Sequence, residues 1–202
     1  SISKTTSPPR VRRSQEASRD NILEAAERLL VQQGPQSLRL ADVAKEAGVA
    51  NATVLHHFGT INGVQAALME KMIAELVSGL LAMDVPADPK SGRGAAMQNL
   101  FDAFESKGAA RLAAWLELTG ESRRLGSVRE AVQSVIRHKI LPHNDAAPDQ
   151  IEDAILVSVI LAVGVGLFGP TLSELLGKQP GRARKVALAL LEESHSKEPP
   201  QI

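Results

Sequence analysis

The sequence predicts an all-α protein, and three observations lead to this prediction. Aromatic residues make up only 2% of the 202 residues and Tyr is absent, whereas strands favour aromatic and β-branched side chains. Apolar residues recur at helical spacing in one segment after another, and no useful length of period-two alternation occurs. Glycine and proline clusters separate these segments as turns. With 44% hydrophobic residues, the chain can also bury a core.

The composition narrows the possible functions. The chain has no Cys, which excludes disulfide scaffolds, Cys-ligated zinc, iron–sulfur clusters and thiol nucleophiles. Its formal net charge is zero, but residues 1–60 hold eight Lys and Arg against six Asp and Glu, so this part is mildly basic. We see no targeting segment and expect a cytoplasmic protein.

We expect three regions along the chain. Residues 1–17 are predicted to form a basic, disordered arm, in which Arg10, Arg12 and Arg13 either enter a DNA minor groove or stay free. Residues 18–62 and 63–197 are predicted to form two helical domains. The helices expected in them span about 19–33, 41–47, 51–57, 61–83, 93–107, 109–124, 127–141, 150–176 and 180–195.

Residues 39–58 have the residue types that a helix-turn-helix requires. Ala44 is small enough for two helices to cross closely, and Gly48 tolerates the positive φ of the turn. Apolar residues fall where the two helices would pack, and Phe58 would close this cluster. The alternative is a tight helical corner without DNA-binding function. The predicted apolar contacts are Val43, Ala47, Val49 and Val54.

The remaining residues of the second helix are predicted to face outward. Most of them are small or form hydrogen bonds, as expected for a helix in a major groove. They are Asn51, Ala52, Thr53, Leu55, His56 and His57.

At these positions the chain resembles the TetR family of transcriptional regulators. Ala47-Gly48-Val49, Thr53 and Phe58 match the pattern that ends the family's DNA-binding domain. The resemblance implies a three-helix DNA-binding domain with a helix-turn-helix. It also implies a larger helical domain that binds a ligand and dimerises, with ligand binding releasing the DNA.

The resemblance implies a set of DNA contacts. Thr53 and His57 match contacting positions, whereas Asn51 and His56 either contact DNA or cap and solvate the helix. Arg39 stands where Ser or Thr is usual, and is either a phosphate contact or a solvated side chain. The complete set is Arg39, Asn51, Ala52, Thr53, His56 and His57.

The chain also departs from the family pattern. Ala50, Ala52, Leu55 and His57 replace a usual Ser, Gly and two Tyr, and Ile61 replaces a Lys that commonly opens the fourth helix. The lost hydroxyls and the lost Lys remove phosphate contacts, which leaves the operator and the affinity open. The rival hypothesis is therefore a helical small-molecule-binding protein or enzyme whose N-terminal domain has lost DNA binding.

The second region contains no convincing set of catalytic residues. We therefore predict that the protein is not an enzyme and binds no cofactor or metal. His138 and His143 are five residues apart, but they are better explained as helix-end residues. One bulky apolar set is either ordinary core or, as the resemblance implies, the lining of a cavity for a largely apolar effector. It comprises Met97, Phe101, Phe104, Leu112, Trp115 and Leu116.

No charge occurs between Asp153 and Glu174. The apolar part of this stretch, residues 154–169, is shorter than the roughly 20 residues that span a bilayer, so we predict a buried interface and no membrane segment. We expect a homodimer through about residues 150–195, with Leu161 and Phe168 among the contacts and close packing at Ala162 and Gly166. The two-fold symmetry of such a dimer predicts a pseudo-palindromic operator in double-stranded DNA, and the protein is expected to be a repressor.

Overall fold

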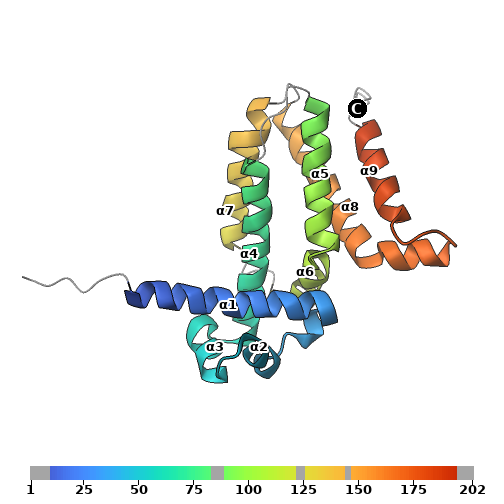
Figure 1. Ribbon diagram of the computed structural model, residues 1–202. Helices are drawn as coiled ribbons and strands as arrows, with labels where there is room; N and C mark the ends of the chain where they lie inside the picture. Colours follow the sequence, from blue (N-terminus) through green and yellow to red (C-terminus); the bar gives the residue numbers. More distant parts are fainter. Residues whose placement is uncertain (1–9, 83–88, 122–125, 144–146, 195–202) are drawn as a thin grey trace, which may run out of the picture. The chain divides into compact units, whose positions relative to one another are not determined.

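The computed structural model describes residues 10–82, 89–121, 126–143 and 147–194, and these residues contain helices and turns but no strand (Figure 1). The all-α prediction is confirmed. The chain divides into two compact units, Ser1–Leu68 and Met69–Ile202. The predicted domain boundary lies between residues 62 and 63, whereas the two units divide after Leu68, inside the continuous helix α4 (Ile61–Ala82).

The first unit contains four consecutive helical elements and the start of α4. They are α1 (Arg10–Gln33), the short η1 (Pro35–Ser37), α2 (Leu40–Ala47) and α3 (Asn51–Phe58). Helix α1 begins at Arg10, so the prediction of a disordered arm through residue 17 is wrong for residues 10–17. This first part of α1 follows Pro9 and is mostly polar, so it forms a helix without the apolar periodicity that predicts helices elsewhere in the chain. Residues 1–9 and the side chains of Arg10, Arg12 and Arg13 lie outside the described residues.

The core of the first unit lies where α1, α2, α3 and α4 meet. Helix α1 contributes Ile22, Leu23 and Leu30, each at most 1% exposed. Spacings of one, seven and eight residues place these side chains on one face of the helix. Completely buried valines complete the core from the other helices: Val43 on α2, Val54 on α3 and Val64 on α4.

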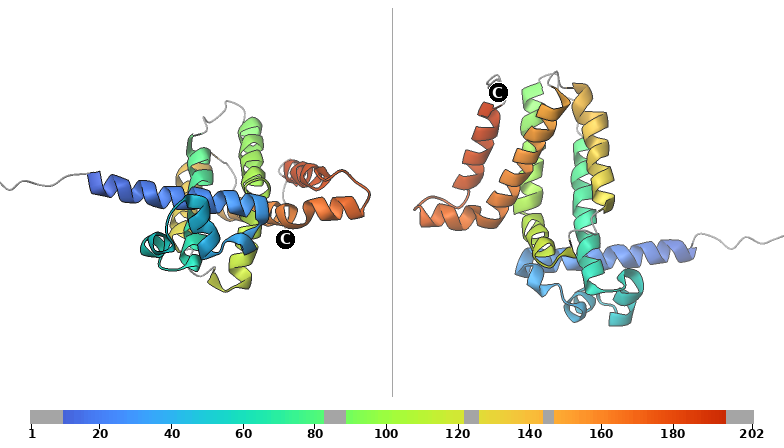
Figure 2. Two further views of the ribbon diagram at one scale, coloured as in Figure 1. Left: turned by 60° about the horizontal axis from the view of Figure 1, so that its bottom comes forward. Right: turned by 180° about the vertical axis from the view of Figure 1, so that it is seen from behind.

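The second unit continues α4 and adds further helices (Figure 2). They are α5 (Pro89–Glu105), α6 (Ala109–Leu118), α7 (Gly126–Val135), the π-helical turn η3 (Ile136–Ile140), η4 (Leu141–His143), α8 (Pro148–Leu175) and α9 (Arg182–Ser194). Helix α6 is shorter than the predicted 109–124, because Gly120 takes a positive φ of 74° after it and ends the helix.

Helix α8 lies against α5, α6 and α9. Its buried face includes Ala162 and Val165, which pack with Phe101 of α5 and Leu191 of α9 in one apolar cluster. Pro170 lies inside α8 and cannot donate a helical hydrogen bond; the ribbon bends in this part of the helix (Figure 1).

Polar contacts of Arg184 fix α9 on α5. The Arg184 guanidinium lies 2.6 Å from Asp102 Oδ1, and a second nitrogen of the group donates to the side chain of Gln98. The guanidinium carbon of Arg184 lies 6.0 Å from the centroid of the Phe101 ring. Because the side chain is only 21% exposed, these contacts are partly shielded from solvent.

Glu75 forms a second polar anchor, between α4 and Lys107 in the turn that joins α5 to α6. Its carboxylate lies 2.9 Å from Lys71 Nζ and 3.4 Å from Lys107 Nζ. Burial raises the pKa of Glu75, but the hydrogen bonds and positive charges of the two lysines outweigh it and hold the pKa below its usual value.

Candidate nucleic-acid interface

The turn between α2 and α3 is a Schellman motif built on Gly48. Gly48 adopts φ 67° and ψ 31°, and its N–H donates to Lys45 O at 3.2 Å. The N–H of Val49 donates to Ala44 O at 3.0 Å, which completes the pattern. A side chain with Cβ is strained in this left-handed conformation, so Gly48 allows the chain to turn directly from α2 into α3. The sequence-based role of Gly48 is therefore explained by its backbone geometry.

Two side chains of α1 hold α2 in place. Asn21 Nδ2 donates to the carbonyl of Ala47, the last residue of α2, at 2.9 Å. Arg28 Nε lies 2.7 Å from Glu46 Oε1, and both side chains are exposed, so this ion pair contributes at most about 1 kcal/mol. Sequence reasoning missed both residues, because a polar side chain on a helix does not reveal which carbonyl or carboxylate it reaches.

The exposed face of α3 lies opposite Val54. Val54 is completely buried, whereas Asn51, Ala52, Leu55 and His56 are exposed. At about 100° per residue, Ala52 and His56 lie close to the direction opposite Val54, and Asn51 and Leu55 lie on one flank. Two of the predicted contacts, Ala52 and His56, therefore share an outward face, and Asn51 is exposed beside it in the first turn of the helix.

The other two predicted contacts on α3 are half-buried. His57 was expected to face outward, but its Nε2 lies 3.2 Å from Ser18 Oγ of α1. The reason is its position three residues after Val54, which brings it towards the packed side of the helix. Thr53 is half-buried on the opposite flank.

Arg19 of α1 stands over the ring of Phe58, with 5.1 Å between the guanidinium carbon and the ring centroid. Phe58, half-buried, thus closes the packing of α3 against α1. Both this contact and the one at His57 join α1 to the last turn of α3, so α1 orients the helix as well as burying it.

Arg39 immediately precedes α2, in an extended conformation with φ −103° and ψ 151°. The side chain of Arg39 is exposed, whereas the side chain of the preceding residue, Leu38, is buried. Gln65 of α4 donates from Nε2 to Leu38 O at 3.3 Å, which anchors the segment that leads into α2. Arg39 is thus a solvent-facing cation at the start of the helix-turn-helix.

The junction of α3 and α4 is closed by Thr60 and Gly63. Thr60 Oγ1 accepts a hydrogen bond from Gly63 N at 3.0 Å, which confirms the predicted cap of α4. A Cβ on Gly63 would stand 2.1 Å from Phe58 O, so the end of α3 approaches α4 closely at this point. Ile61, where the family pattern has Lys, is half-buried.

The residues predicted to contact an effector lie on α5 and α6. Phe101, Leu112 and Leu116 are completely buried. Met97 and Phe104 are partly buried against the apolar cluster around Phe101, and Trp115 is half-buried on α6. All six residues thus belong to the second unit, and three of them are part of its buried core.

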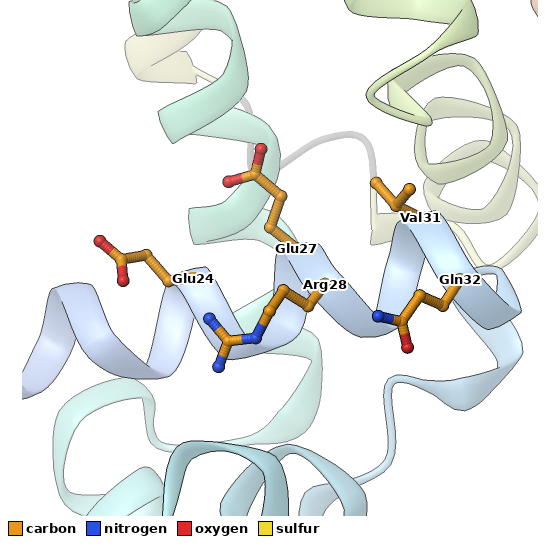
Figure 3. A pocket seen from close by; sticks show the side chains of 5 residues that line it. All are labelled: Glu24, Glu27, Arg28, Val31 and Gln32. Atoms are coloured by element: carbon orange, nitrogen blue, oxygen red, sulfur yellow. The ribbon is translucent and has the colours of Figure 1, made fainter.

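A hollow of about 430 Å³ lies elsewhere, on the side of α1. Figure 3 shows the five side chains that line it, all of them on one helix. All of the lining residues belong to α1, and none is among the predicted effector contacts. They are Glu24, Glu27, Arg28, Val31 and Gln32.

The predicted dimer contacts on α8 need correction. Ala162 is completely buried inside the unit, and a Cβ on Gly166 would meet Ala110 and Phe104 at 2.8 Å, so these small residues serve packing within the chain. Leu161 is also packed against the core cluster. Helical spacing correctly showed that α8 has apolar faces, but it did not show which face α5 and α6 cover.

A different apolar face of α8 is exposed. Ile160 is 59% and Phe168 60% exposed, and between them Gly164 has open space where a Cβ would stand. On α9, Leu190 is 54% exposed. The other exposed apolar residues of the two helices are Leu156, Val157, Leu172, Leu175 and Val186.

Among the described residues, α8 has the length and apolar composition of a membrane span. Helix α8 packs against α5, α6 and α9, and 22% of its most apolar window is buried by this packing. Asp149 lies in its first turn, where a negative charge suits the helix dipole.

The geometry defines a helix-turn-helix held by a third helix, which is the architecture of a class of DNA-binding regulators. Residues 22–68 match the family described as bacterial regulatory proteins, tetR family. This segment thus resembles the DNA-binding domain of TetR-family transcriptional regulators. No curated protein is significantly similar in sequence to it.

Solved structures share the fold of almost the whole chain. A transcriptional regulator from Rhodococcus sp. Rha1 is 20% identical with a TM-score of 0.67, covering 88% of this chain and 95% of that one. A TetR variant from Acinetobacter baumannii AYE, in complex with minocycline, is 20% identical with a TM-score of 0.62 and coverages of 85% and 90%. The fatty acid degradation regulator FadR from Bacillus halodurans is 15% identical, with a TM-score of 0.62 and coverages of 93% and 96%.

Proposed function

We propose that the chain is a TetR-family transcriptional regulator, a homodimeric repressor that leaves a pseudo-palindromic operator when a small, largely apolar effector binds. The observation that carries the proposal is the outward face of α3, which is exposed while the opposite face is locked to α1 and α4. A rigidly held helix with an exposed face of small and hydrogen-bonding residues suits insertion into a major groove.

The proposed DNA contacts divide into two kinds. Ala52 and His56 approach base edges from the outward face of α3, Asn51 does so from its exposed first turn, and Arg39 binds a phosphate at the start of α2. Thr53 and His57 are half-buried at the flanks, where they reach the sugar–phosphate backbone at the edge of the groove. In this arrangement His57 also keeps its contact with Ser18, so it couples α1 to the DNA-facing helix.

The proposed dimer forms through α8 and α9. The exposed apolar residues of these helices form a face too large to remain in water on a soluble protein, and Gly164 at its centre lets a second helix approach closely. A second copy of the same face is the natural cover, because a two-fold interface uses one patch twice. It also explains the apolar character of α8 without a membrane, in keeping with a cytoplasmic protein.

The proposed effector binds beside Trp115, near Met97 and Phe104. These side chains are the incompletely buried members of the set on α5 and α6, while Phe101, Leu112 and Leu116 form its packed floor. The solved relative that holds minocycline shows that a protein of this fold binds a small molecule. The effector acts by binding more tightly to the DNA-free conformation, and no catalysis is involved.

A selection experiment tests the function. Purified protein is incubated with fragmented genomic DNA from its source, and the retained fragments are sequenced. We expect one shared, two-fold symmetric motif for the wild type and none for an Asn51→Ala/His56→Ala double variant of equal melting temperature. Retention of random fragments by both proteins would contradict the proposal.

A further inference from the structure

Leu55 is an apolar side chain on the flank of the outward face of α3. It is 40% exposed, and it lies three residues after the exposed Ala52, within about 60° of it around the helix axis. The core positions of this helix are already filled by Val54, which is completely buried, and by Phe58. The carbonyl of Leu55 accepts a hydrogen bond from Gly59 N at 2.8 Å, which closes the end of the helix.

We propose that Leu55, beside Ala52, reads the C5-methyl group of a thymine in each operator half-site. The inference rests on the proposed function, because it requires α3 to enter the major groove. Thymine is the base whose major-groove edge carries a methyl group in unmodified DNA, and apolar side chains contact that methyl. A leucine placed over the polar edge of another base would bury a donor or acceptor without a partner, which lowers affinity.

The position of Leu55 on the helix fits this role. Asn51, in the first turn, lies four residues before Leu55 and therefore about 6 Å from it along the helix axis. Both residues are exposed on the same flank. When Asn51 reaches a base edge from the N-terminal turn, as recognition helices do, Leu55 lies over base pairs about two steps away.

Ala52 makes the close approach possible. Its side chain is a single methyl group, and it is exposed near the centre of the outward face. A longer residue there would hold the helix away from the bases, and Leu55 would then not reach the groove floor. The pair thus forms a small apolar patch next to hydrogen-bonding side chains.

The test uses a selected, unmethylated synthetic duplex in which each thymine is replaced in turn by uracil, which removes only the methyl group. Binding is measured for wild type, Leu55→Ala and Leu118→Ala. Leu118 is 85% exposed on α6, so it provides the same substitution away from the proposed DNA face. Melting temperatures of all three proteins establish that they are folded.

We expect one symmetric pair of thymines at which uracil weakens wild-type binding by about fourfold per half-site, and by roughly fifteenfold when both are replaced. Leu118→Ala keeps this discrimination, and Leu55→Ala loses it because the side chain that meets the methyl is gone. Equal uracil sensitivity of wild type and Leu55→Ala, or no sensitivity at any thymine, would overturn the inference while leaving the proposed function intact. Binding only to duplexes with methylated cytosine would also overturn it. A wild type that binds no DNA would overturn both proposals.

Discussion

Replacing Gly63 by Ala tests the junction that orients α3. The added Cβ would stand 2.1 Å from Phe58 O and 3.1 Å from Phe58 C, whereas such contacts are essentially never shorter than 3.0 Å. The end of α3 would therefore have to move by roughly 1 Å. Overpacking of this kind costs about 1–3 kcal/mol, which outweighs the gain of up to about 1 kcal/mol expected when Ala replaces Gly in a helix.

Gly79 provides the matched control in the same helix, α4. It is exposed, and a Cβ there would meet nothing within 4 Å, so Gly79→Ala should gain the helical propensity without a clash. For a chain of this size, 1 kcal/mol corresponds to about 2–4 °C in melting temperature. We expect Gly79→Ala to raise the melting temperature by a few degrees with unchanged DNA affinity, and Gly63→Ala to lower both.

Thermal unfolding followed by circular dichroism measures the first effect, and a binding titration with a selected operator duplex measures the second. A Gly63→Ala protein as stable as Gly79→Ala would show that the Phe58 carbonyl does not approach α4 so closely. The reasoning about this junction would then be refuted.

Four further perturbations have defined outcomes. Ile160→Asp should give a monomer in sedimentation, because an unpaired buried charge costs several kcal/mol, whereas Leu118→Asp should remain dimeric; two dimers would contradict the α8 interface. Ile61→Lys should steepen the plot of log K against log salt by about 1.8 for a dimer, and an unchanged slope with a lower melting temperature would make Ile61 a core residue. An apolar compound that releases DNA should change the fluorescence of Trp115, and unchanged emission would place the effector elsewhere. Because the pKa of Glu75 is lowered in the folded state, its contribution to stability is present above the usual carboxylate pKa and is lost as the pH falls below it; Glu75→Gln should reduce this loss, and an identical acid-unfolding profile would contradict the assignment.

The sequence was sufficient to predict the helical fold and the helix-turn-helix because both depend on local signals. Gly48 is required by a backbone conformation, and the apolar spacing around Val43 and Val54 follows from helix geometry alone. These features are readable without knowing what packs against them. The same holds for the cap formed by Thr60.

What the sequence did not predict depends on neighbours that are distant in the chain. Periodicity identified α8 as apolar, but Ala162 and Gly166 turned out to pack inside the unit, while Ile160 and Phe168 are exposed. His57 likewise is predicted to face outward from its place in the sequence, whereas its ring lies against Ser18 of α1. The side chains of one helical turn point in all directions around the axis. Which of them are buried therefore depends on where the other helices lie.

The start of α1 could not be predicted from the sequence for a different reason. Ser14, Gln15 and Glu16 are polar and exposed, so this part of the helix lacks an apolar stripe, and we attribute the start of the helix at Arg10 to helix propensity. The contacts of Asn21 with Ala47 and of Arg28 with Glu46 were missed for a related reason. Long polar side chains reveal their partners only when the tertiary structure is known.

Hydroxyl-radical footprinting on a selected genomic fragment tests most directly whether the protein is a dimeric, major-groove-reading regulator. We predict two protected half-sites related by a two-fold axis, with centres about 34–36 Å apart or a multiple of this distance. The protection should disappear in the Asn51→Ala/His56→Ala variant at the same protein concentration. A single protected half-site, a direct repeat or protection that survives in the variant would contradict the prediction.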